Sequence, residues 1–163
     1  ACFAKDNIEE ALALASLQSK ATHASRHAEQ CCQILTELLC QLINGKPLPS
    51  ALEQTHKRQW NSEISTMMRR KIVEESEDDI QSDGYVINTL HAALWSTLTT
   101  DSFESAVLRA CNLGDDADTT AAVAGQIAGA MYGYSNIPQD LKVGLMDERK
   151  LYVTSQFFSR KAG

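Results

Sequence analysis

Apolar residues recur at helical spacing along nearly all of the chain. The clearest case lies between Ser25 and Asn44, where one apolar stripe repeats at intervals of three and four residues. Its members are Cys31, Ile34, Leu35, Leu38, Leu39 and Leu42. Asn44 and Gly45, with Pro47 just beyond them, end this helix as a left-handed cap requires. No stretch alternates apolar and polar residues for long enough to indicate a strand, so the sequence predicts an all-α fold.

Capping patterns predict where other helices begin. Asp6 and Glu9 form a capping box at the start of the first helix, and Asp101 and Glu104 form a second one. Pro138 is suited to the first position of a further helix, because its missing N–H is not needed there.

The middle of the chain is more polar. The segment Ser50–Ser76 predicts helix with a break near Trp60. Glu74–Asp79 carries five acids in six residues and, together with Ser82–Gly84, predicts an exposed connection. A strongly apolar helix is expected from Val86 onward.

The composition is that of an ordinary globular domain. The chain has 163 residues, of which 44% are hydrophobic and 22% are charged, so one domain is expected and disorder is excluded. The tract Ala121–Tyr132 is interrupted by Gln126 and is shorter than the ~20 residues of a membrane span. A net charge of −6 argues against binding to a nucleic-acid backbone. Five cysteines without a CxxC pair argue against a disulfide scaffold and a thiolate zinc site, and favour a reducing, cytoplasmic location.

The densest group of chemically active side chains is Gly114–Thr120. It holds three carboxylates and two hydroxyls at the entry to a helix of small residues. Such hard oxygen ligands suit Mg²⁺ and Mn²⁺. The residues alone also allow a simpler interpretation, in which Asp118 is an N-cap favoured by the helix dipole and Asp115 and Asp116 are solvated loop acids.

The helix behind these acids has a face almost without side chains. Ala121, Gly125, Gly129 and Gly133 repeat every four residues. Glycine costs about 1 kcal/mol relative to alanine in a helix interior, so this repetition predicts close approach of another backbone. A buried, rigid helix would also hold an oxygen-ligand cluster in place.

Three blocks of the sequence together resemble the C-terminal part of the ADP-ribosylglycohydrolase family, which includes the dinitrogenase-reductase-activating glycohydrolases. The blocks are Ser82–Trp95, Asp101–Val107 and Asn112–Ala121, and Ser19–His23 is a weaker match to the family's Ser/Thr-His block. The resemblance covers nearly the whole chain and is weakest in Leu48–Asp79 and in the last dozen residues.

The resemblance implies an all-α fold with a two-metal site, Mg²⁺ or Mn²⁺, at the mouth of an ADP-ribose cleft. Members cleave the bond between the anomeric carbon of ADP-ribose and a modified protein side chain or small acceptor. The matching positions imply that Asp116, Asp118 and Thr119 are metal ligands and that Asp118 bridges both ions. Asp115 is not counted as a ligand.

Three further residues are implied to bind the substrate. His23 is expected near the ribose or phosphates, and Gly84 and Tyr85 on the adenosine side of the cleft. No catalytic residue is implied beyond the metal ligands.

One feature of the family is absent from this sequence. A Thr-Asp-Asp-Thr type block supplies the other metal ligands in the family, and a single Asp-x-Asp-Thr cluster cannot provide about six oxygens for each of two ions. The chain also begins at Ala1 without a methionine. Residues 1–163 are therefore expected to be the C-terminal portion of one all-α domain, whose partner is the missing N-terminal half.

The predicted function is metal-dependent hydrolysis of an ADP-ribosyl bond in a modified protein or a small ADP-ribose conjugate. An alternative is a catalytically inactive relative that binds ADP-ribose or a nucleotide, or has a structural role. A third possibility is that the 163 residues do not form an independent folding unit. In that case Gly125, Gly129 and Gly133 would pack against a helix of the missing half. The acceptor is left open: arginine, serine, a nucleic-acid base or a free metabolite.

Several conspicuous side chains are expected to be structural. The resemblance implies no ligand role for three of the histidines, which are His27, His56 and His91. Trp95 and Tyr132 lie at helical core spacing, which is typical of packing residues.

Overall fold

The computed structural model describes residues 4–145 and 147–161, which form helices joined by short connections. No strand occurs in these ranges, so the all-α prediction is confirmed. The α-helices are α1 (Ile8–Lys20), α2 (Arg26–Ile43), α3 (Leu48–Thr55), α4 (Ser62–Met68), α5 (Val86–Leu98), α6 (Phe103–Asn112), α7 (Ala117–Tyr132), α8 (Gln139–Val143) and α9 (Glu148–Lys161). Short 3₁₀ turns are η2 (Ile72–Glu74), η3 (Glu77–Asp79) and η4 (Tyr134–Asn136).

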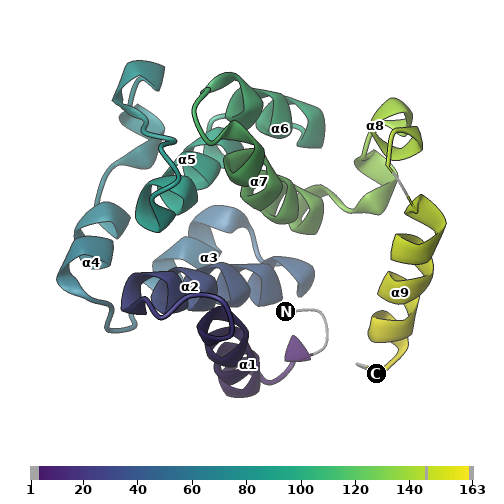
Figure 1. Ribbon diagram of the computed structural model, residues 1–163, viewed down its shortest axis with the longest axis horizontal. Coiled ribbons are helices and arrows are strands. Elements are labelled where there is room, and N and C mark those ends of the chain that lie inside the picture. Colours follow the sequence, from purple (N-terminus) through teal and green to yellow (C-terminus); the bar gives the residue numbers. More distant parts are fainter. Residues whose placement is uncertain (1–3, 146, 162–163) are drawn as a thin grey trace.

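Helix α2 joins two groups of helices. In Figure 1, α5, α6 and α7 lie above α1, α2 and α3, while α8 and α9 lie at one end. Helix α2 packs against α1 and α3 on its own side and against α5 and α7 on the other. Its apolar stripe fills the core, where Ile34 and Leu38 are fully buried with Leu94 of α5 and Ile127 of α7. Burial of this apolar surface is the main force that holds α7 against the rest of the molecule.

Most predicted helix ends agree with the structure to within a residue or two. The segment Ser50–Ser76 is less helical than predicted: it breaks near Trp60 as expected, but α4 ends at Met68 and the 3₁₀ turn η2 follows. The α2 prediction is confirmed, with Ser25 as its N-cap and Gly45 at φ +83° just after its end. Both predicted capping boxes are wrong by one residue, because the N-caps are Asn7 and Ser102. Asn and Ser cap as well as Asp does, so periodicity alone does not choose between neighbours. Pro138 is likewise the residue before α8 rather than its first.

The small-residue face of α7 has its packing partner within the chain. A Cβ added to Gly125 would meet Val107 Cγ2 at 3.7 Å, and one added to Gly129 would meet Phe103 Cε2 at 3.9 Å. Both contacts are with α6, which packs closely on α7. Gly125 and Gly129 therefore have a neighbour within the chain, whereas a Cβ added to Gly133 would meet nothing within 4 Å, so the possible need for a helix of the missing half stays a prediction.

The acidic connection before α5 is not simply exposed, as the sequence had indicated. Ile80 and Ser82 are buried. The Glu75 side chain is only 13% exposed, with Oε2 2.9 Å from His91 Nε2 and Oε1 2.7 Å from Arg70 Nε. The reason is that Glu75, one acid of the run, pairs with the buried His91 and with the more exposed Arg70, which a charge pattern does not reveal. The connection is thereby attached to α5, and His91 is a buried structural residue, as predicted.

Across the parts of the chain that are described, no helix is both long enough and apolar enough to cross a membrane.

The buried His91 should make the stability of the fold depend on pH. Burial lowers the pKa of His91 below its usual 6.5. The negative charge of Glu75 raises this pKa in part, and the positive charge of Arg70 lowers it further. The unfolded chain then takes up a proton before the folded chain does. The His91 contribution to stability is therefore complete above pH ~6.5 and is lost as the pH falls toward the folded-state pKa. Urea unfolding of the wild type and of His91→Gln between pH ~7.5 and ~5.5 should give a smaller loss of unfolding free energy for the variant. Equal losses would contradict this assignment.

Candidate functional site

Two connections that are distant in sequence meet at the start of α7. The backbone N–H of Asp116 donates to the Ser82 carbonyl at 2.9 Å, and Ser82 Oγ donates to the Gly114 carbonyl at 3.0 Å. Gly114 and Asp115 both have positive φ, +80° and +49°, so the chain turns sharply before entering α7. The connection before α5 and the turn before α7 are therefore held together as one unit, which we call the loop junction (residues 82–85 and 114–119).

Gly84 lies against the Asp116 carboxylate. A Cβ at Gly84 would be 2.9 Å from Asp116 Oδ2, and the backbone φ is +78°. Both the lack of space and the left-handed backbone require glycine at this position. The structure thus brings together Asp116, which the sequence assigned to the metal, and Gly84, which it assigned to the adenosine.

Asp116 occupies the N-cap position just before α7, but its side chain does not cap the helix. Its side chain makes no capping hydrogen bond, and Oδ1 instead accepts from Thr119 Oγ1 at 2.8 Å. Asp118 lies in the first turn, where its Oδ1 accepts from the Thr119 N–H at 3.0 Å. The simpler interpretation that Asp118 is the N-cap is wrong. The three predicted ligands therefore lie at the N-cap position and in the first turn of α7, with Asp116 half-buried and Asp118 and Thr119 exposed.

The donor atoms suit a hard divalent ion but supply only part of its shell. Carboxylate and hydroxyl oxygens are the ligands that Mg²⁺ and Mn²⁺ prefer. In residues 4–145 and 147–161, however, no three His, Cys, Asp or Glu side chains are grouped so as to hold a metal ion. Asp116, Asp118 and Thr119 can thus form one side of a metal site, and the remaining donors must come from elsewhere.

Tyr85 follows Gly84 and precedes α5. Its backbone N–H donates to Asp83 Oδ1 at 3.0 Å. Its hydroxyl donates to Glu63 Oε1 at 3.0 Å and lies 3.2 Å from His27 Nδ1. The sequence did not indicate Glu63, and it assigned His27 a structural role, because contacts between the ends of separate helices leave no periodic signal.

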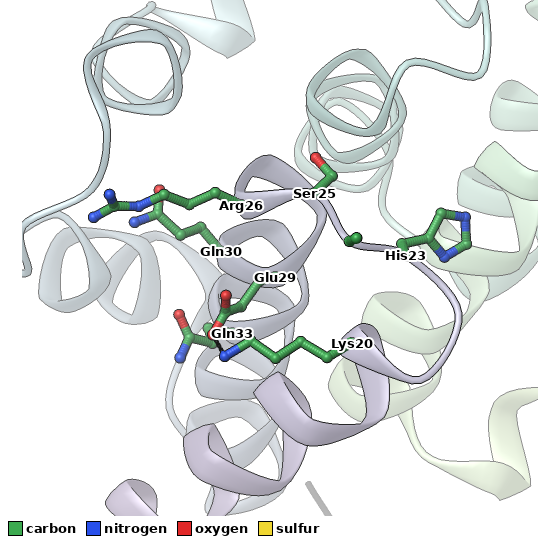
Figure 2. A pocket seen from close by; sticks show the side chains of 8 residues that line it. Lys20, His23, Ser25, Arg26, Glu29, Gln30 and Gln33 are labelled. Atoms are coloured by element: carbon green, nitrogen blue, oxygen red, sulfur yellow. Dashed lines mark ion pairs between the residues drawn. The ribbon is translucent and has the colours of Figure 1, made fainter.

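His23 lies in the turn between α1 and α2, beside a polar cavity of about 590 Å³. Figure 2 shows its ring directed away from Arg26 and Gln30, which line the other side of the cavity. His23 Nδ1 is 2.9 Å from Thr22 Oγ1. None of the contacts among the described residues joins His23 to Asp116 or Gly84, so its predicted role in binding ribose or phosphate stays a prediction.

The sequence comparison decides the family. A family model described as ADP-ribosylglycohydrolase matches residues 1–161. The chain belongs to the ADP-ribosylglycohydrolase family. The resemblance on which the sequence analysis relied is thereby confirmed, and the loop junction lies in two of its three blocks.

Individual family members are similar over most of this chain. An ADP-ribosylarginine hydrolase of Serratia proteamaculans is 40% identical over 149 residues, which are 91% of this chain and 40% of that protein. An ADP-ribosyl-[dinitrogen reductase] glycohydrolase of Rhodospirillum rubrum is 29% identical over 127 residues, 74% of this chain and 38% of that protein.

A solved structure of a family relative confirms the fold. A chain described as an ADP-ribosylglycohydrolase-related protein complex superposes with a TM-score of 0.89 at 30% identity, covering 99% of this chain and 56% of its own length. The chain therefore has the family's helical fold, while it spans about 40% of the two curated relatives.

The loop junction should tolerate no side chain at Gly84. Gly84→Ala forces a left-handed alanine against the Asp116 carboxylate, so we expect a loss of about 2 kcal/mol in unfolding free energy. Gly125→Ala is the matched control, because its new methyl group would make an ordinary contact with Val107 and improve helix propensity by up to about 1 kcal/mol. Urea denaturation of both variants measures the difference. Equal stability of the two variants would contradict the described junction.

Proposed function

We propose that this chain takes part in the hydrolysis of the bond between ADP-ribose and a modified protein side chain. Membership of the ADP-ribosylglycohydrolase family over residues 1–161 supports this reaction class. Arginine is the acceptor that we favour, because a relative 40% identical over 91% of the chain is named an ADP-ribosylarginine hydrolase. The substrate would then be an ADP-ribosylated protein.

The observation that carries the proposal is the placement of the Asp116 carboxylate between Gly84 and Thr119. One oxygen accepts the Thr119 hydroxyl hydrogen and the other lies against the Gly84 backbone. A carboxylate that does not cap its own helix is available to another ligand. The positive end of the α7 dipole further stabilises negative charge at this point.

Asp116, Asp118 and Thr119 would hold Mg²⁺ or Mn²⁺, with two ions in the completed site. Such ions, when bound, polarise the hydroxyl groups of the ribose and position a water for attack at the anomeric carbon. The Thr119 hydroxyl orients the Asp116 carboxylate, and Tyr85 and His23 would contact the adenosine and the ribose or phosphates. The remaining oxygens would come from a second segment that carries the family's other acidic block, the N-terminal half.

The metal ligands can be tested with two neighbouring isosteric variants. Asp118→Asn removes a proposed ligand. Asp115→Asn changes an acid three residues earlier that is not a proposed ligand, and asparagine also tolerates the left-handed backbone at this position. We expect Mn²⁺ affinity, followed by electron paramagnetic resonance, to fall at least about tenfold in Asp118→Asn, which is about 1.4 kcal/mol, and to change little in Asp115→Asn. Equal Mn²⁺ affinities of Asp118→Asn and the wild type would contradict the ligand assignment.

The reaction itself is tested by the release of ADP-ribose from an arginine-ADP-ribosylated protein, detected by mass spectrometry with and without Mg²⁺. In the enzyme completed by the segment that carries the family's other acidic block, we expect release that depends on the metal and is lost when this chain carries Asp118→Asn. ADP-ribose binding without a response to Mg²⁺ or Mn²⁺, and without release, would instead support the non-enzymatic alternative. Release only from a serine-linked substrate would exclude arginine as the acceptor.

A further inference from the structure

We propose that His27 and Glu63 are positioning residues that hold the Tyr85 ring at the loop junction as a fixed stacking surface for the base of the ligand. The inference rests on the proposed function in one respect, because it takes ADP-ribose as that ligand. Neither residue belongs to the family pattern that the sequence displays. Glu63 lies in the segment where the resemblance is weakest.

The three side chains form a closed cluster. The Tyr85 hydroxyl donates to Glu63 Oε1 at 3.0 Å and is 3.2 Å from His27 Nδ1, while His27 Nε2 is 3.6 Å from Glu63 Oε2. Because the hydroxyl hydrogen points to Glu63, the His27 Nδ1 atom must donate to the hydroxyl oxygen. The two rings also meet edge to face, with centroids 6.2 Å apart and planes at 89°.

The cluster holds the hydroxyl end of the Tyr85 side chain, while hydrogen bonds already hold the Tyr85 backbone. The Tyr85 N–H donates to Asp83, and its carbonyl accepts from the Thr89 N–H at 2.9 Å. With both the backbone and the hydroxyl held, the two side-chain torsions have no freedom left. Tyr85 is nevertheless 39% exposed as a residue, so it is held in place while part of its surface stays open to solvent.

The Tyr85 hydroxyl stays protonated and can therefore donate a hydrogen bond. Partial desolvation and then the hydrogen bond to Glu63 raise the pKa of the Tyr85 phenol. It therefore keeps its proton at neutral pH. Burial also raises the pKa of Cys31, on the same helix as His27, to about 12, so no thiolate adds charge to this surface.

The position of the ring connects the cluster to the candidate site. Tyr85 directly follows Gly84, whose backbone touches the Asp116 carboxylate. The cluster takes its other members from the first turns of α2 and α4, so three separate elements converge on one hydroxyl. Exposed hydrogen bonds of this kind add little to folding stability. Preorganising a stacking side chain lowers the entropic cost of ligand binding. The cluster is therefore better explained by ligand binding than by folding stability.

The experiment compares ADP-ribose with ribose 5-phosphate, which lacks the base, in calorimetric titrations of the full chain with Mg²⁺. Tyr85→Phe, His27→Ala and Glu63→Ala should each weaken ADP-ribose binding about fivefold. Affinity for ribose 5-phosphate should not change. The double variant Tyr85→Phe with Glu63→Ala should bind no more weakly than Tyr85→Phe alone, because each change removes the hydrogen bond between the Tyr85 hydroxyl and Glu63.

Two control variants match these changes in chemistry but lie elsewhere. His56→Ala removes an exposed histidine, and Glu104→Ala removes an exposed acid from the first turn of α6, as Glu63→Ala does from α4. Both controls should bind ADP-ribose as the wild type does.

Three results would overturn the inference. If the wild type binds ADP-ribose and the three variants bind it equally well, the cluster does not position the ring. If the double variant is weakened by the sum of the single effects, or if both ligands are weakened alike, the effect is a general structural one. If the wild type binds neither ligand, Tyr85 is no binding surface of this chain and the inference fails, whereas the proposed function is tested separately by release of ADP-ribose from the completed enzyme.

Discussion

The contact between the Gly84 backbone and the Asp116 carboxylate is the constraint on which the candidate site depends. With a φ of +78° and an added Cβ only 2.9 Å from Asp116 Oδ2, this position accepts glycine alone. The hydrogen bonds between Ser82 and the turn before α7 keep the two connections in register. As a result, a single junction places both the start of α5, with Tyr85, and the start of α7, with the proposed metal ligands.

The helical core gives this junction a rigid base. Thr120 is fully buried directly after the exposed Thr119, and Ile127 and Ala128 are buried two turns further along α7. This pattern fixes the rotation of α7 against α2 and α5, so the face that carries Asp118 and Thr119 is directed outward. The glycine positions of α7 allow α6 to pack closely from another side. Rigid support of this kind is what a set of metal ligands requires.

Comparison of particular elements shows how far the sequence alone could lead. The long apolar stripe of α2 predicted that helix and both of its ends, because a repeated period of 3.6 residues has few alternatives. The capping boxes at Asp6 and Asp101 were each misplaced by one residue, since adjacent residues have similar capping propensity. The role of Glu75 and the cluster around Tyr85 could not be predicted, because the partner of a charge in another element has no signature in local spacing. The metal ions, the role of His23, the cytoplasmic location and the assignment to a C-terminal portion stay predictions.

The central claim is that the first turn of α7 holds divalent metal beside a bound ADP-ribose. Crystals of the chain grown with MnCl₂ and ADP-ribose, measured at the manganese absorption edge, test it most directly. The account predicts an anomalous peak about 2.1 Å from oxygens of Asp116, Asp118 or Thr119, with the adenine ring stacked on Tyr85. An ordered ADP-ribose bound away from Gly84 and Tyr85, or a manganese peak at other residues only, would contradict it.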